Sequence, residues 1–278
     1  MTVLSFSLLL AAVSVVAGFL GSLTGLGGGV IVVPALALLF GVDIRYAIGA
    51  SVVSVIATSS GAAATYVREG IPNIRIGLFL EIATTLGALA GAYLAVRIST
   101  DVVGIIFGGV LIYSALQSVF SHHDAAGSAG PDALAQRLRL DGDYIINGDR
   151  REYHVQHVPT GFGVMFIAGS LSGLLGIGSG AFKVLAMDRA MKIPFKVSTT
   201  TSNFMIGVTG AASAGVYLSR GYIEPAIAMP VMIGVLAGAF VGSRVLLKTD
   251  PSLLRRVFAA MILLVAIEMI YNGLTGKL

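Results

Sequence analysis

The sequence predicts an all-α polytopic membrane protein built from two homologous repeats, and three observations support this fold class. Hydrophobic residues make up 56% of the chain and charged residues only 12%, a composition far from that of a soluble domain. Apolar runs of about 20 residues, the length that a helix needs to cross a bilayer, recur between short polar segments. The second half of the chain also aligns with the first half without a gap.

The apolar runs give the predicted membrane segments in chain order. The first run lacks a basic start and a cleavage site of small residues, so we expect it to be a retained membrane segment and not a signal peptide. The runs predict about eight segments, or about ten if the long first run of each half crosses twice. They are 3–40, 47–67, 76–96 and 102–120 in the first half, and 160–187, 198–218, 224–246 and 253–274 in the second.

The internal repeat is strongest around a glycine-rich stretch. GFLGSLTGLGGG at 18–29 aligns with GSLSGLLGIGSG at 169–180, and the same register places Ser51 on Ser202. Internal repeats are common in secondary transporters, which bind their substrate where the repeats meet. The repeats are parallel if each first run crosses once, and inverted if it crosses twice or re-enters. The distribution of basic residues does not decide between these orientations.

A polar linker at 121–159 separates the repeats, which span 1–120 and 160–278. It holds all four histidines of the chain, and Asn147 and Gly148 stand between two short alternating stretches. An Asn-Gly pair in that setting is typical of a β-hairpin. We therefore predict a small water-exposed β-ribbon here, with a disordered connector as the alternative.

Glycines interrupt the first apolar run of each half. Glycine weakens a helix and frees backbone groups that lipid cannot satisfy, so such a break is tolerated where it is buried in protein or lines a cavity. Free N–H groups at a helix break favour an anion. Close helix packing by small residues is the alternative. The candidate binding glycines are Gly25, Gly27, Gly28, Gly176 and Gly178.

Hydroxyl and amide side chains lie near these breaks and at the start of the next apolar run. Such donors can replace the hydration shell of an oxyanion without burying a fixed charge. Helix capping and hydrogen bonds between helices are the alternative, which we favour for Ser198 and Thr199. The candidate binding residues of this kind are Thr24, Ser51, Ser179, Thr201, Ser202 and Asn203.

Lys183 follows the second break by one helical turn and aligns with Val32, so only one repeat carries this charge. A cation near membrane depth is costly and is usually functional. Lys183 would complement a bound anion. The alternatives are that it extends to the membrane surface or pairs with Asp188.

Glu81 and Glu268 are the acidic residues deepest in the predicted segments, and Glu268 aligns with Gln117. A carboxylate at membrane depth can take up and release a proton, so both are candidates for proton coupling. Alternatively, each caps a helix end or pairs with an arginine such as Arg75.

The sequence excludes several function classes. It has no Walker A motif, no G-x-S-x-G nucleophile elbow and no H-E-x-x-H helix, so we expect no enzymatic activity. It has no cysteine, which excludes disulfides and thiolate metal sites. Its basic residues are scattered between apolar runs and form no patch, which argues against nucleic-acid binding. The linker histidines are better read as solvated side chains than as metal ligands. We predict neither a cofactor nor a metal.

The two glycine-rich stretches, SLTGLGGGVIVVPAL at 22–36 and LLGIGSGAFKVLAM at 174–187, resemble the TauE/SafE sulfite exporter family, also described as the 4-toluene sulfonate uptake permease family. The stretches AIGASV and TTTSNF that follow them carry the same resemblance, which covers both halves but not the linker. The second half departs from the first by having Leu185 in place of Pro34 and Ser179 within the glycine cluster.

The resemblance implies a multi-pass transporter of the cell inner membrane that exports small sulfur-containing anions, such as sulfite or organosulfonates, using an ion gradient. A passive anion channel is the main alternative, and a membrane enzyme acting on a phosphate or lipid is a weaker one. The expected partners are the anion and the lipid bilayer, with protons as the coupling ion and a second copy of the chain as further candidates.

Overall fold

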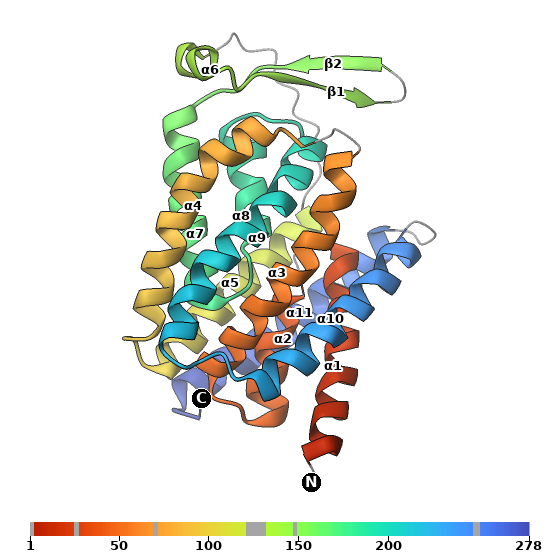
Figure 1. Cartoon of the computed structure of the whole chain (residues 1–278), viewed down its shortest axis with the longest axis vertical. Coiled ribbons are helices and arrows are strands. Elements are labelled where there is room, and N and C mark those ends of the chain that lie inside the picture. The colour runs from red at the N-terminus through yellow and green to blue at the C-terminus, as the bar shows by residue number, and fades with distance from the viewer. Residues whose placement is uncertain are drawn as a thin grey trace.

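The computed structural model describes residues 3–24, 28–68, 72–120, 132–146, 149–246 and 251–277, and it is mostly helical (Figure 1). The first half contains α1 (Val3–Thr24), α2 (Gly29–Pro34), the π-helical turn η1 (Ala35–Leu39), α3 (Ile44–Arg68), α4 (Ile74–Ala95) and α5 (Thr100–Phe120). The second half contains α7 (Val158–Leu175), α8 (Gly180–Leu185), η2 (Ala186–Ala190), α9 (Phe195–Ser219), α10 (Pro225–Leu246) and α11 (Pro251–Leu274). The same order of elements therefore occurs before and after the linker.

The helices fit the thickness of a membrane. The long helices have 18 to 25 residues, or roughly 27 to 38 Å at 1.5 Å per residue. Among the described residues, α4 and α7 meet both a length and a hydropathy criterion for crossing. Large apolar side chains also cover the outside of the bundle, as where Leu78, Ile82 and Leu86 of α4 are more than half exposed. An apolar outer surface of this kind suits contact with lipid.

The glycine breaks interrupt the first run of each half as predicted. The two runs predicted at 3–40 and 160–187 are each two helical pieces, since α1 ends at Thr24 and α7 ends at Leu175. In the second break Gly176 and Gly178 have φ values of +66° and +73°, which favour glycine over any residue with a Cβ. The predictions for Gly25 and Gly27 fall outside the described residues.

The helices pack in pairs that join the two halves. Helix α1 packs along α10, α4 packs along α7, and α5 packs along α11. Helices α4, α7, α8 and α9 form one group, and α1, α2, α3 and α10 form another, while the pair α5 and α11 belongs to neither. The two groups are joined by extensive packing of α3 along α9. The first helix of each half therefore belongs to the same group as the α4 or α10 helix of the other half.

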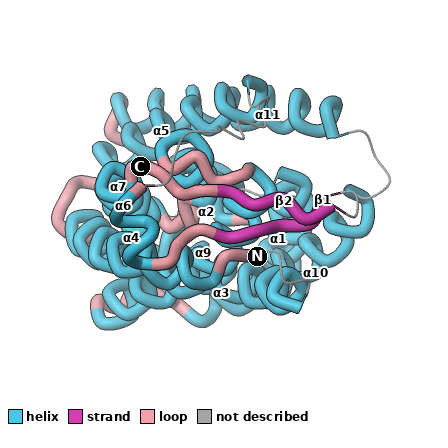
Figure 2. The backbone as a smooth tube through the Cα atoms, turned by 90° about the horizontal axis from the view of Figure 1, so that it is seen from above, coloured by secondary structure: helices cyan, strands magenta, loops and turns pink. Residues whose placement is uncertain are grey.

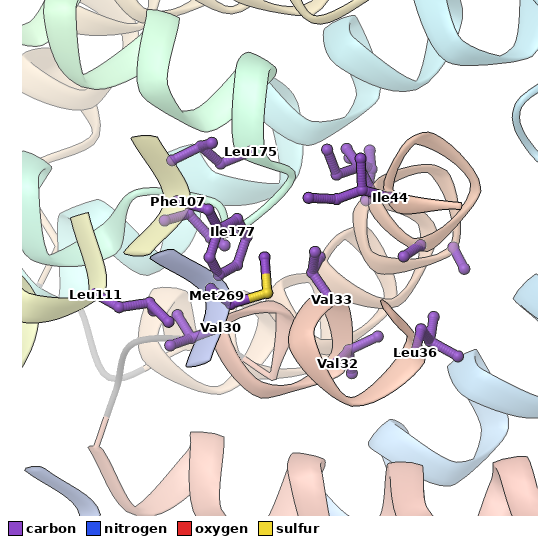
Figure 3. Close-up of a cluster of buried hydrophobic side chains, with 14 of the residues drawn as sticks. Val30, Val32, Val33, Leu36, Ile44, Phe107, Leu111, Leu175, Ile177 and Met269 are labelled. Carbon is purple, nitrogen blue, oxygen red and sulfur yellow. The ribbon is translucent and has the colours of Figure 1, made fainter. Parts of the chain in front are cut away.

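The larger buried cluster lies on the side of α2, α3, α5 and α11 and includes residues of the second break (Figure 3). Val30 and Val33 of α2 contribute to it together with Leu175 and Ile177, which border Gly176. Its labelled members in the figure are Val30, Val32, Val33, Leu36, Ile44, Phe107, Leu111, Leu175, Ile177 and Met269.

The linker forms the predicted β-ribbon, which lies across one end of the bundle (Figure 2). Strands β1 (Gly142–Ile146) and β2 (Asp149–Tyr153) pair antiparallel, and Asn147 and Gly148 between them lie outside the described residues. A short helix, α6 (Ala133–Leu138), was not predicted. The expectation of a wholly water-exposed linker is wrong at its base, because Leu140, Tyr153 and Val155 are buried in a second cluster with α4, α7 and η2.

Both termini lie at the end of the bundle opposite the linker (Figure 1). In the same view α1 leads away from the terminal end, and α7 leads away from the linker end. The two halves thus begin at opposite ends of the molecule.

Candidate functional site

The two helix breaks meet at the contact between α3 and α9. Ser51 of α3 donates a hydrogen bond of 2.7 Å from its Oγ to the carbonyl oxygen of Gly176 in the second break. Gly29, at the start of α2, lies so close that a Cβ added there would be 2.6 Å from Ser51 Oγ and 2.9 Å from the Gly176 carbonyl oxygen. Both broken segments are therefore in direct contact, and Ser51 joins them.

Ser179 stands in the second break with an unusual backbone and an unusual side chain. Its φ of +48° is in the left-handed region, and its side chain is buried. Its Oγ makes no hydrogen bond within the part of the chain that the structure describes. Buried hydroxyls nearly always have a partner, so this unpartnered hydroxyl next to a helix break is unusual.

Lys183, on α8, is fully buried at 0% exposure and lies one turn after Ser179. Its Nζ donates a 2.5 Å hydrogen bond to Oγ1 of Thr209 on α9. The lysine thus does not extend to the membrane surface, which was one of the two alternatives to a functional role. Besides this hydrogen bond to Thr209, Lys183 interacts electrostatically with Glu81 of α4.

Glu81 is buried and completes this group, which we call the charge cluster: Glu81, Lys183 and Thr209. Thr209 Oγ1 donates to Glu81 Oε1 at 2.7 Å, and Thr85 Oγ1 donates to the same oxygen at 3.1 Å. Glu81 therefore does not pair with Arg75, whose guanidinium donates to the carbonyl oxygen of Arg139 instead. The single hydroxyl of Thr209 links the two buried charges.

The remaining predicted residues of α9 have different surroundings. Thr201 is buried, and its Oγ1 accepts a 3.0 Å hydrogen bond from the backbone N–H of Asn73. Ser202 Oγ donates to the carbonyl oxygen of Gly180 at 3.3 Å, so it supports the second break. Asn203 lies within α9 and is half-buried. Ser198 and Thr199 donate to backbone carbonyl oxygens of Ile193 and Phe195, as the structural alternative predicted.

Of the other predicted residues, Glu268 lies apart from this region, Thr24 cannot be assigned to it, and Gly28 contacts α10. Glu268 is exposed on α11 beside the exposed Leu264 and Ile267, and so lies apart from the buried charge cluster. Thr24 ends α1, and its side chain falls outside what the structure describes. Gly28 begins the second piece of the first run and would place a Cβ 2.7 Å from the side chain of Val235.

Thr209 and Asn73 are site residues that sequence reasoning missed. Thr209 occupies the position in the second repeat that Thr58 occupies in the first, and the repeat alignment could have identified it. Asn73 caps α4, since its Oδ1 accepts a hydrogen bond from the backbone N–H of Ile76. Its Nδ2 also donates to Tyr153 Oη at 2.8 Å, which ties the linker to the loop before α4. No sequence pattern marks that second role.

Comparison with known sequences gives the family. The sequence model of the sulfite exporter TauE/SafE family matches residues 10–269. The chain belongs to this family. The TauE/SafE chain is 25% identical over 273 residues to the probable membrane transporter protein YunE of Bacillus subtilis, covering 96% of this chain and 98% of YunE.

Other relatives agree with this assignment. The probable membrane transporter protein YdhB of Bacillus subtilis is 26% identical, with 85% of this chain and 87% of YdhB covered. A probable membrane transporter protein of Methanocaldococcus jannaschii is 27% identical, with 91% of each chain covered. No solved structure gives a significant match. This TauE/SafE protein is therefore a multi-pass membrane transporter and not an enzyme.

Proposed function

We propose that this protein is a secondary transporter that exports small sulfur-containing anions, such as sulfite or organosulfonates, across the cell inner membrane. The observation that carries the proposal is Lys183, a fully buried cation one turn after a helix break. A cation held in the core of a membrane protein attracts an anion and marks a substrate path. The name of the family supports a sulfur oxyanion as that substrate.

The proposed binding region lies where the two breaks meet. Ser179 Oγ supplies an unsatisfied donor there, and Lys183 supplies the positive charge. Ser51 and Ser202 hold carbonyl oxygens of the second break through their hydroxyls, and we assign them the role of shaping the region. Lys183 and Ser179, and not the ends of the six-residue helices α2 and α8, are the features that favour an anion.

We further propose that the two halves are inverted repeats and that the broken first run of each half enters the membrane and returns. The termini at one end and the linker at the other support this arrangement, since each half then crosses an odd number of times. Inverted repeats with broken helices meeting at the middle are typical of secondary transporters. Of the two acidic candidates, we propose Glu81 as the proton carrier because it is buried next to Lys183, whereas Glu268 is exposed.

Transport by the purified protein in sealed vesicles tests this function. We expect saturable uptake of radiolabelled sulfite or 4-toluenesulfonate, with acceleration when the same unlabelled anion is present inside. Lys183→Met should abolish that uptake, while Lys196→Met should not, because Lys196 is an exposed lysine at the start of α9. A flux that does not saturate and shows no acceleration would instead identify a passive channel.

A further inference from the structure

We propose that the transporter takes up one anion together with one proton, so that the charge cluster keeps the same net charge in its empty and loaded states. This inference rests on the proposed anion transport and adds its stoichiometry. With this stoichiometry the concentration gradient of the anion itself drives export, and a pH gradient that is acidic outside opposes it. In the empty state the carboxylate of Glu81 balances the ammonium of Lys183. In the loaded state Glu81 is protonated, and the bound anion balances Lys183.

The distribution of buried charge supports a constant net charge of the charge cluster. Among the buried residues that the structure describes, Glu81 and Lys183 are the ones with formally charged side chains, and they have opposite signs. A lone anion added to this pair would leave one uncompensated negative charge in an apolar region, which is strongly unfavourable. Protonation of Glu81 removes that excess. Loss of the proton from Lys183 would not help, because it would remove the cation that holds the anion.

The hydrogen bonds around Glu81 can accommodate both protonation states. Glu81 Oε2 is buried and makes no hydrogen bond to a described residue, so it has a free lone pair to receive a proton. Thr209 Oγ1 lies within donor distance of two acceptors, Glu81 Oε1 at 2.7 Å and the carbonyl oxygen of Met205 at 2.9 Å. When Glu81 is protonated, the Thr209 hydroxyl can therefore rotate and donate to the Met205 carbonyl oxygen instead. Lys183 Nζ can donate to Thr209 in either case.

Among the described residues, few other groups influence the protonation of Glu81. Helix α7 packs along α4 but has no titratable side chain within Val158–Leu175. On α9, Lys196 is exposed at the helix start and Tyr217 lies near the other end, bonded to the Gly173 carbonyl oxygen. The groups that face Glu81 come from three helices, namely Thr84 and Thr85 of α4, Lys183 of α8 and Thr209 of α9. Lys183 is the charged member of this set, so the protonation of Glu81 responds to what Lys183 binds.

Calorimetry on the purified protein tests the stoichiometry directly. The probe is 4-toluenesulfonate, which carries a single negative charge at every pH used. Titrations in buffers of different ionisation enthalpy report the number of protons taken up with each anion. We expect one proton per anion for the wild-type protein and a dissociation constant that rises about tenfold for each pH unit above the point where free Glu81 ionises.

Variants separate coupling from folding. Glu81→Gln mimics protonated Glu81, so it should bind the anion with no proton uptake and with an affinity that does not change with pH. Thr209→Ser keeps the hydroxyl and should retain the wild-type pH profile, whereas Thr209→Val should alter it. If Thr209→Val does not fold, the contrast between wild type and Glu81→Gln still decides the matter. Thermal unfolding of each variant controls for stability.

The results distinguish the two proposals. Saturable binding without proton uptake, or an unchanged pH profile in Glu81→Gln, would overturn the coupling and leave anion transport standing. Absence of any binding or transport of sulfite and 4-toluenesulfonate by the wild-type protein would overturn the sulfur-anion function and the coupling with it. In vesicles, a gradient of one pH unit should drive about tenfold accumulation of 4-toluenesulfonate, and a membrane potential alone should drive none. Accumulation driven by the potential would contradict one-to-one coupling.

Discussion

The close packing of α4 on α7 predicts that Gly91→Ala will destabilise the protein. A Cβ at Gly91 would lie 1.9 Å from the carbonyl oxygen of Ser170 and 2.9 Å from the backbone nitrogen of Leu174. Ordinary contacts of a Cβ begin at 3.4 Å, so the two helices would have to separate by roughly 1.5 Å at this point. Because the neighbouring atoms belong to the backbone of α7, no side-chain rotation can relieve the clash.

The size of the effect follows from two opposing terms. Replacing glycine by alanine within a helix contributes up to about 1 kcal/mol of stability through helix propensity. Overpacking of a closely packed interface costs about 1–3 kcal/mol, and a clash with backbone belongs at the upper end of that range. We expect Gly91→Ala to have a free energy of unfolding about 2 kcal/mol below that of the wild type.

Gly109→Ala is the matched control, since Gly109 lies within α5 and an added Cβ there meets nothing within 4 Å. It gains the same helix propensity without a clash, so it should be as stable as the wild type or slightly more stable. Unfolding in detergent, followed by circular dichroism over a titration with a denaturing surfactant, measures both variants. Equal stability of Gly91→Ala and Gly109→Ala would refute the close approach of α4 and α7.

Three further predictions concern the linker and the second break. Asn73→Ala removes a helix cap and the hydrogen bond to Tyr153, so it should lower stability by about 1–2 kcal/mol and speed hydrogen exchange in the ribbon. Burial raises the pKa of Tyr153 to about 12 from an ordinary value of 10.0. The stability that the protonated tyrosine contributes is therefore complete below pH 10 and is lost as the pH rises from 10 to 12. Unfolding of Tyr153→Phe, measured as a function of pH, should lack that loss. Ser179→Gly relieves a left-handed φ of +48° and removes an orphaned hydroxyl, so calorimetry should show equal or higher stability but weaker binding of 4-toluenesulfonate.

The sequence was most informative about elements that depend on local pattern. Apolar runs predicted α3, α4, α5, α9, α10 and α11 within a few residues of their observed ends, because a membrane-length helix requires a long uninterrupted apolar stretch. Glycines predicted the break after α7. Asn147 and Gly148 predicted the hairpin. Both predictions succeeded because these residues determine the local backbone conformation directly. Helix α6 and the burial of Tyr153 were missed, since both depend on how the linker packs on the bundle.

The site was predictable as single residues but not as an arrangement. Lys183 and Glu81 were both recognised because a charge at membrane depth is rare. Nothing in the sequence indicates that they share the hydroxyl of Thr209, since that contact depends on the packing of α4 and α8 against α9. Glu268 has the same local signal as Glu81, but it points outward. Both the lipid-facing and the protein-facing sides of a membrane helix are apolar, so hydrophobic pattern does not show which side faces the protein. The sequence therefore could not distinguish the positions of these two carboxylates.

The grouping of helices affects what can move during transport. Glu81, Lys183 and Thr209 come from α4, α8 and α9, which all pack within one group, although Glu81 belongs to the first half of the chain and the others to the second. Ser51 belongs to the other group, through α3, and its bond to Gly176 crosses between the groups. A movement of one group against the other would therefore separate Ser51 from the second break and leave the two buried charges together. The two groups differ from the two halves of the sequence, because α4 and α10 each pack with helices of the opposite half.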